Sequence, residues 1–178
     1  MIEIQSGDVI IDGISLQSCP RDAIRAKITV IPQEPVLFPG SVRENIAAFK
    51  VIDDDKVLQA LEKVELREHV MAHGDLDAKI DDLPLSAGQR QLVCLARAIT
   101  MKQKILLLDE ATSRVDDKTD QLMQQVIRQE FSGCTIIAVA HRAHTLLDFD
   151  RIAVIDEGRV VDRPQSDRTA TFAIGIDS

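Results

Sequence analysis

Two adjacent carboxylates, Asp109 and Glu110, follow a continuous apolar run at residues 105–108. Such a run is typical of a parallel strand that is buried on both faces, and these strands end at the sheet edge where α/β proteins bind ligands. Asp109 is suited to holding Mg²⁺, directly or through water, and Glu110 is suited to activating the water that attacks a phosphoryl group. A strand followed by an acidic turn explains the same residues, so both hypotheses remain open for this pair alone.

A second set of residues, 86–89, begins a segment with helical spacing that extends to about Met101. Ser86 followed by Gln89 matches a capping box, which requires no ligand. Gly88, however, costs a helix about 1 kcal/mol relative to alanine, which indicates a close backbone approach. A helix N-terminus with a serine hydroxyl and an unshielded glycine N–H also favours an anion, so the alternative hypothesis is a phosphate partner.

Two single residues could complete such a site. His141 follows an apolar segment at residues 135–140, and its imidazole could donate to a phosphate oxygen or position a water. Gln33 lies in a proline-rich loop, where its neutral amide could ligate Mg²⁺ or hold the attacking water. A lone histidine after a strand is more often structural, and one glutamine in a loop is weak evidence by itself.

The elements that must position these residues alternate between strands and helices. Turn signals and β-branched residues predict a hairpin at 7–16, and apolar runs predict strands at 28–31, 105–108, 135–140, 152–155 and 159–161. Helical spacing predicts helices at 21–26, 41–49, 53–65, 86–101, 117–131 and 145–148. This alternation indicates an α/β fold with a parallel sheet and right-handed crossovers. Residues 163–178 lack periodicity and are predicted to form an irregular tail.

Composition excludes several classes of function. The 178 residues carry a net charge of −8, so no general attraction to nucleic acid or anionic lipid is expected. The apolar runs are far shorter than the roughly 20 residues that span a bilayer. Cys19, Cys94 and Cys134 show no CxxC or Cys/His spacing, which supports neither a disulfide framework nor a zinc site and fits a reducing cytosolic setting.

Four segments, taken in order, resemble the motifs of an ATP-binding-cassette (ABC) nucleotide-binding domain. IPQEPVLFPGSVRENI, LSAGQRQLVCLARA, ILLLDEATSRVD and IIAVAHR are similar to its Q-loop, signature, Walker B plus D-loop, and H-loop. The sequences of the first two motifs are similar to those in the second such domain of subfamily C, the multidrug-resistance-associated exporters. The resemblance implies a P-loop NTPase fold with an inserted helical subdomain. It predicts a partial ABC ATPase domain over residues 1–162, with residues 1–33 and 104–162 as the core and residues 34–103 as the Q-loop and helical signature subdomain.

The resemblance also implies a role for each site residue. Gln33 would sense the γ-phosphate of ATP and the Mg²⁺, Asp109 would serve the metal, and Glu110 would be the catalytic carboxylate. His141 would be the switch histidine. A second nucleotide-binding domain would pair head-to-tail with this one, and its ATP would be covered by the signature and D-loop residues Ser86, Ala87, Gly88, Gln89 and Asp116.

The chain departs from the family pattern at several points. Ala87 stands where the strict signature has glycine, and the D-loop reads SRVD in place of the common SALD. No glycine is followed by lysine, so the phosphate-binding pattern GxxxxGK[ST] does not occur in the sequence, and no Tyr or Trp could stack on adenine. In the family both features lie upstream of the matching region, so the chain is expected to be truncated at its N-terminus and inactive alone.

Three functions compete. The first is part of an ATP-driven exporter, at the cytosolic face of a membrane and attached to transmembrane domains elsewhere in the parent protein. The second is a non-catalytic module that offers its signature face to a complete cassette. The third, an ABC ATPase of DNA repair or translation, is disfavoured by the transporter-like LSxGQRQ and by the acidic charge, which argues against nucleic acid as a partner. The expected truncation favours the first.

Overall fold

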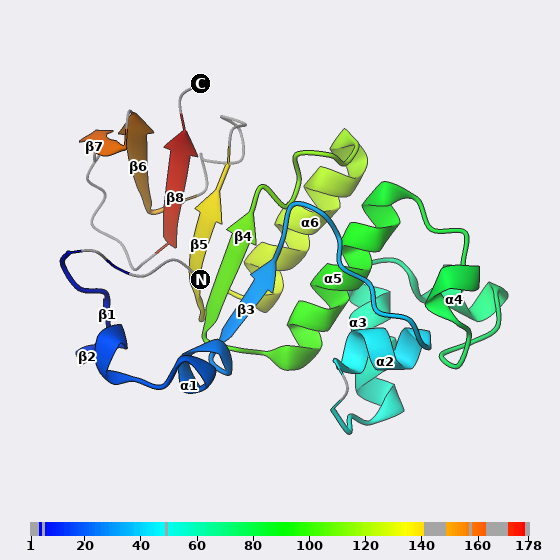
Figure 1. The fold of residues 1–178 in the computed structure, drawn as a ribbon. Helices are drawn as coiled ribbons and strands as arrows, with labels where there is room; N and C mark the ends of the chain where they lie inside the picture. Colours follow the sequence, from blue (N-terminus) through cyan, green and yellow to red (C-terminus); the bar gives the residue numbers. More distant parts are fainter. Residues whose placement is uncertain are drawn as a thin grey trace.

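The computed structural model describes residues 4, 6–48, 50–140, 149–156, 158–162 and 171–176. Its main feature is a sheet of the order β3-β4-β5-β8-β6-β7 (Figure 1). The strands are β3 (Ile28–Ile31), β4 (Ile105–Asp109), β5 (Thr135–Val139), β8 (Thr171–Ile176), β6 (Arg151–Asp156) and β7 (Arg159–Asp162). Neighbouring strands are parallel from β3 through β6, and β7 returns antiparallel to β6. The predicted α/β fold with a parallel sheet is confirmed.

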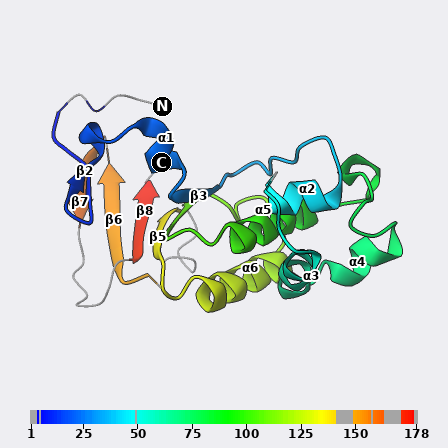
Figure 2. The same cartoon turned by 90° about the horizontal axis from the view of Figure 1, so that it is seen from below.

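The described residues also form the helices α1 (Arg21–Arg25), α2 (Val42–Ala47), α3 (Asp54–Lys63), α4 (Arg67–Ala72), α5 (Ala87–Met101) and α6 (Asp117–Glu130), with short 3₁₀ turns at Leu16–Ser18 and Ile80–Asp82. Of these, α5 and α6 pack against one face of β3–β5. α2, α3 and α4 lie at the opposite end of the molecule from β6 and β7 (Figure 2). A small hairpin, β1 (Ile10–Ile11) with β2 (Ile14–Ser15), precedes α1.

The two faces of β3–β5 differ in burial. Side chains alternate between the faces of a strand, and the parallel register places Ile31, Leu108 and Ala138 on the same face, where each is nearly inaccessible. This face belongs to a core shared with α5 and α6. The opposite face carries half-buried apolar side chains, and Val30 is 53% exposed. The expectation that the 105–108 strand is buried on both faces is therefore wrong for this face.

Helix starts follow local chemistry. Ser41 with Glu44 at α2, and Ser86 with Gln89 at α5, both form complete capping boxes. Asp53 caps α3 by accepting a hydrogen bond from the backbone N–H of Asp55.

Two elements differ from the sequence predictions. The α4 helix was not predicted, because its N-cap residue, Leu66, makes no side-chain cap. Thr171–Ile176 form β8 in the middle of the sheet, so the expectation of an irregular tail is wrong for these six residues. The helix predicted at residues 145–148 lies outside the described residues. Within the described part of the chain, no helix has the length and apolarity that a bilayer span requires.

Candidate functional site

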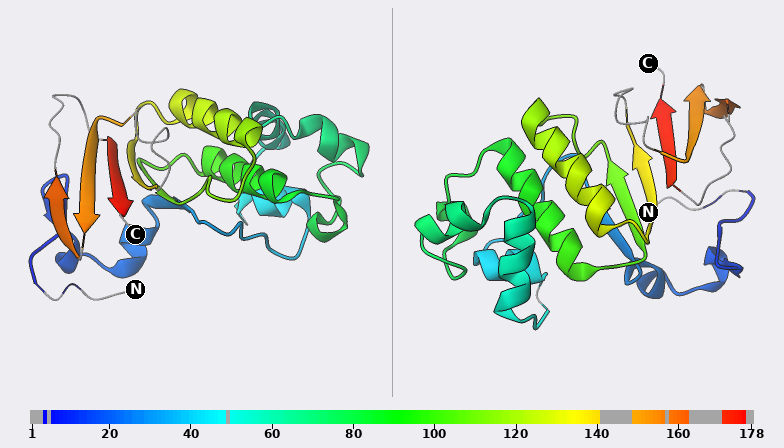
Figure 3. Two further views of the ribbon diagram at one scale, coloured as in Figure 1. Left: turned by 90° about the horizontal axis from the view of Figure 1, so that it is seen from above. Right: turned by 180° about the vertical axis from the view of Figure 1, so that it is seen from behind.

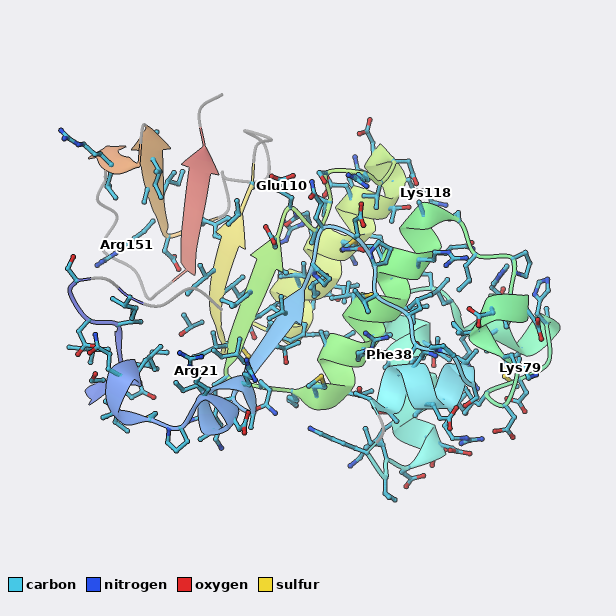
Figure 4. The ribbon with its side chains drawn as sticks, viewed as in Figure 1. Arg21, Phe38, Lys79, Glu110, Lys118 and Arg151 are labelled. Carbon is cyan, nitrogen blue, oxygen red and sulfur yellow. The ribbon has the colours of Figure 1, made fainter. Side chains whose placement is uncertain are left out.

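Gln33 and Glu110 meet at the carboxyl edge of the sheet. The side-chain Nε2 of Gln33 donates to Oε2 of Glu110 at 2.5 Å, although 77 residues separate the two in the sequence. The pairing follows from the register, since Ile31 of β3 lies beside Leu108 of β4 and each functional residue comes two positions later. Figure 4 shows Glu110 at the end of β4. The structure thus brings together two of the predicted site residues.

The backbone turns sharply at Glu110. Its φ of 45° lies in the left-handed region, which costs a non-glycine residue about 1–2 kcal/mol. The Glu110 N–H donates to the Val139 carbonyl at 3.0 Å, and the Ser113 N–H donates to the Glu110 carbonyl at 2.9 Å. These two bonds hold the turn, so the Glu110 side chain leaves the strand at an orientation that regular β geometry would not give. Strain of this kind collects at functional sites.

Two side chains at this edge carry oxygen atoms that could hold the Mg²⁺ of a nucleotide. Asp109 is exposed at the last position of β4. Because the amide N–H of Gln33 is directed to Glu110, its Oε1 is the atom left to act as an acceptor or metal ligand. Mg²⁺ in nucleotide enzymes is held by one or two protein groups together with substrate phosphates and water. Asp109 and Gln33 match that donor set.

The N-terminus of α5 carries the four signature residues. Ser86 Oγ accepts from the Gln89 N–H at 3.1 Å, and Gln89 Oε1 accepts from the Ser86 N–H at 2.9 Å. Ser86 and Ala87 are exposed, whereas Gly88 is buried. A Cβ on Gly88 would lie 3.0 Å from Thr119 Oγ1 and 3.2 Å from its Cγ2. Close packing on α6 therefore accounts for the glycine, and the prediction that it is unshielded is wrong.

Asp116 caps α6 beside this contact. Its carboxylate accepts from the Thr119 N–H at 3.0 Å and from the Thr119 hydroxyl at 2.7 Å. The hydrogen bond from the hydroxyl is the main cause that lowers the pKa of Asp116, and the backbone N–H of Thr119 adds to it. Thr119 thus joins the D-loop to the signature helix, and α5 and α6 run side by side (Figure 3). Sequence reasoning missed Thr119, whose only signal was its spacing of three from Asp116.

A clamp of side chains that the sequence did not reveal holds the loop after Gln33. Arg97 of α5 donates from Nε to the Asn45 carbonyl at 2.7 Å and from Nη1 to the Val36 carbonyl at 2.8 Å. Its guanidinium also lies 4.7 Å from the centre of the Phe38 ring, a cation–π contact. Asn45 in turn exchanges two 2.8 Å hydrogen bonds with the backbone of Phe38. An arginine and an asparagine within otherwise apolar helix faces were the available signal.

The remaining predicted residue, His141, lies outside the described residues. A cavity of about 1030 Å³ is found at the opposite edge of the sheet, where Ile28, Ile105 and Thr135 begin their strands. It is therefore remote from Glu110.

Comparison with known proteins decides the family. Residues 1–113 match the sequence profile of the ABC transporter family. The chain belongs to the ABC transporter family. The match identifies these residues as part of an ATP-binding domain. A structural neighbour confirms the expected P-loop NTPase fold. That neighbour is a bacterial Atm1-family ABC exporter with ATP bound, at a TM-score of 0.82 and 30% identity, covering 90% of this chain and 29% of the exporter chain.

Curated relatives include a member of subfamily C, the subfamily that the motifs indicated. ATP-binding cassette sub-family C member 2 of Rattus norvegicus is 47% identical over 165 residues, and the metal resistance protein YCF1 of Saccharomyces cerevisiae is 44% identical over 166 residues. ABC multidrug transporter B of Aspergillus fumigatus is 45% identical over 162 residues. Each match covers 91% of this chain but 11% of the relative, so the chain spans about a ninth of their length.

Proposed function

We propose that the chain is part of an ATP-hydrolysing domain that powers export by an ABC transporter. The observation that carries the proposal is the hydrogen bond between Gln33 and Glu110 at the carboxyl edge of the sheet. Membership of the family and the relatives' names support it. In the parent protein the domain would lie at the cytosolic face of a membrane, joined to transmembrane domains, with no role for nucleic acid.

Each residue at the edge has a proposed task. MgATP would supply the phosphoryl group and the metal charge that steadies it, and Asp109 and Gln33 would hold the metal. Glu110 would accept the proton of the attacking water, since a carboxylate within hydrogen-bond reach of a water can act as a general base. The donor from Gln33 holds that carboxylate in one orientation. His141 would be the switch histidine.

The exposed end of α5 has a second proposed role. Ser86, Ala87 and Gln89, with the backbone at Gly88, would close over ATP bound to a second nucleotide-binding domain, in a head-to-tail pair. Asp116 would lie at the same interface through its contact with Thr119. Exposure of Ser86 and Ala87 at a helix N-terminus, where N–H groups favour anions, supports this proposal.

The isolated chain is proposed to be inactive. The sequence holds no GxxxxGK[ST], the loop whose backbone N–H groups cradle the phosphates of ATP. We expect its dissociation constant for MgATP to be no tighter than about 1 mM, which corresponds to about −4 kcal/mol. Isothermal titration calorimetry measures it directly, and micromolar affinity would overturn this part of the proposal.

The decisive experiment uses a domain in which a relative's GxxxxGK[ST] segment is joined in frame before residue 1. Glu110→Gln should abolish steady-state hydrolysis and leave ATP binding intact, because the amide keeps the shape of the side chain but cannot take a proton. Ser86→Ala should leave ATP binding to its own domain unchanged and slow turnover of a complete partner cassette. If Glu110→Gln hydrolysed ATP at the unmutated rate, the catalytic assignment would be wrong.

A non-catalytic signature module is the alternative, and the exposed signature residues also favour it. In that case the joined domain would not hydrolyse ATP, yet the original chain would still change hydrolysis by a complete cassette. The Ser86→Ala variant would abolish that change and Glu110→Gln would not. Mixing each variant with the partner therefore separates the two functions.

A further inference from the structure

A buried glutamine on α5 contacts the residue next to Gln33. Gln91 is 1% exposed, and its Nε2 donates to the Pro32 carbonyl at 2.8 Å across 59 residues of sequence. Pro32 directly follows β3 and has no N–H to offer, so its carbonyl is the polar backbone group that can fix the start of the loop. Gln91 provides that fixing point immediately before Gln33.

Stability alone is a poor explanation for this residue. Gln91 Oε1 is buried and has no hydrogen-bond partner among the described residues. A buried polar atom without a partner destabilises a fold, and an apolar side chain of similar size would not carry that cost. Gln91 is therefore better explained by the position that its N–H group imposes on Pro32.

Gln91 and two further residues hold the same loop from one face of α5. Positions 91, 94 and 97 are three apart, a spacing that places side chains on a common helix face. Cys94 and Arg97 both contact the Val36 carbonyl, so α5 holds the loop on either side of Gln33, at Pro32 and at Val36. The loop must follow α5 when that helix shifts.

We propose that Gln91 is a positioning residue that sets where the Gln33 amide meets Glu110. Because the capping box of Ser86 and Gln89 begins the same helix, any displacement of the signature end reaches Glu110 through Gln91, Pro32 and Gln33. The effect of Gln91 on catalysis rests on the proposed function, whereas its effect on the position of the Gln33 amide does not. The arrangement links contact with a partner domain to the carboxylate of this domain's own site.

The test compares the full chain with Gln91→Leu and with a matched control, Thr100→Val. Thr100 also sends a hydrogen bond from α5 to a backbone carbonyl, that of Ile46 at 2.7 Å, but not to the loop at 32–38. In dilute ¹⁵N-labelled protein, hydrogen exchange of the Gln33 side-chain amide should be about tenfold faster in Gln91→Leu. This is the change expected when the amide loses its hydrogen bond to Glu110. Thr100→Val should leave it unchanged. Gln91→Asn, whose amide is too short to reach Pro32, should behave like Gln91→Leu and serves if the leucine variant does not fold. Exchange within twofold of the unmutated chain in a folded variant would overturn the proposal.

A second measurement separates this inference from the proposed function. In the domain joined to a P-loop segment, Gln91→Leu should lower kcat about tenfold without changing the dissociation constant for ATP, and Thr100→Val should change neither. If the unmutated joined domain does not hydrolyse ATP, the proposed function fails while the exchange experiment still decides the positional role. If it hydrolyses ATP and Gln91→Leu keeps the full rate, the link from α5 to Glu110 is overturned.

Discussion

Cys94 lies on the loop-facing side of α5 and is 4% exposed. Burial raises the pKa of its thiol, and this outweighs the lowering by the nearby Arg97 cation and by the hydrogen bond to Val36. Cys19 and Cys134 are free thiols with half-exposed side chains. The thiolate is the reactive form of cysteine, so the thiol of Cys94 should be less reactive than those of Cys19 and Cys134.

We expect iodoacetamide at pH 7 to label Cys94 at least about tenfold more slowly than Cys19 or Cys134, because both burial and the raised pKa withhold the thiolate. Peptide mass spectrometry after short labelling times measures each rate. In guanidinium chloride the three rates should converge. Equal rates in native buffer would show that the clamp around Arg97 and Val36 is open in solution.

Asp116 gives a pH-dependent prediction. Its pKa is lowered from the ordinary 3.8, first by the Thr119 hydroxyl. A carboxylate with a lowered folded-state pKa contributes stability that is complete above the unfolded-state value and is lost as the pH falls through the folded-state value. Asp116→Asn should therefore lower the Tm at pH 7, and the difference from the unmutated chain should shrink as the pH falls below 3.8. Calorimetric scans over pH 2.5–7 test this, with exposed Asp55→Asn as the control. A difference that stays constant with pH would contradict it.

The contact between α5 and α6 depends on a glycine opposite a threonine. Thr119 is β-branched, and its hydroxyl and N–H are both bonded to Asp116, so it cannot rotate away from an added methyl. The 3.0 Å approach at Gly88 then outweighs the helix propensity that alanine would bring.

Gly88→Ala should lower the free energy of unfolding by about 1–3 kcal/mol, the usual cost of overpacking. In a Thr119→Ala background the same substitution should instead raise it, by up to about 1 kcal/mol, because only helix propensity remains. Urea denaturation of the four proteins of this cycle measures the coupling. If Gly88→Ala had the same effect in both backgrounds, the packing explanation would be wrong.

The success of sequence reasoning varied between elements. β4 and α5 were predicted because a continuous apolar run and a capping box are local signals. The meeting of Gln33 with Glu110 depends on β3 lying beside β4, a strand order that the sequence did not predict. The bonds of Gln91 to Pro32 and of Arg97 to Val36 span more than 50 residues and depend on side-chain directions that no local pattern specifies. β8 was missed because its pairing partners lie in β5 and β6, and nothing within residues 171–176 indicates them.

At the scale of the whole molecule, the uncovered face of β3–β5 is the main liability. It carries half-buried or exposed apolar side chains at Ile28, Val30, Ile105, Leu107, Ile137 and Val139. Parallel sheets normally have both faces covered, and exposed apolar patches favour association. β8 fills the position between β5 and β6, so the hazard lies on this face and not at an open edge in the centre of the sheet.

We expect the isolated chain to aggregate as its concentration is raised, and Val30→Thr to slow that aggregation. Val30 is 53% exposed, so its threonine variant should change the free energy of unfolding by less than about 0.5 kcal/mol. Its neighbour Ile31 is fully buried on the other face, and Ile31→Thr should cost about 2–4 kcal/mol. Static light scattering and urea denaturation measure the two effects. A chain that stays monodisperse as its concentration is raised would contradict the role of this face.

The position of β8 also affects the order in which the strands of the sheet can pair during synthesis. Residues 28–31, 105–109 and 135–139, which form β3–β5, emerge first, and the β6–β7 hairpin follows, but the strand that lies between β5 and β6 is synthesised after all of them (Figure 1). The hairpin must therefore wait, unpaired with β5, until residues 171–176 leave the exit tunnel. Such late, non-local pairing is slow and leaves strand edges open to chaperones and to neighbouring chains. The strands that carry the edge with Glu110 are thus translated early, while the strand that joins the two halves of the sheet is translated after both halves.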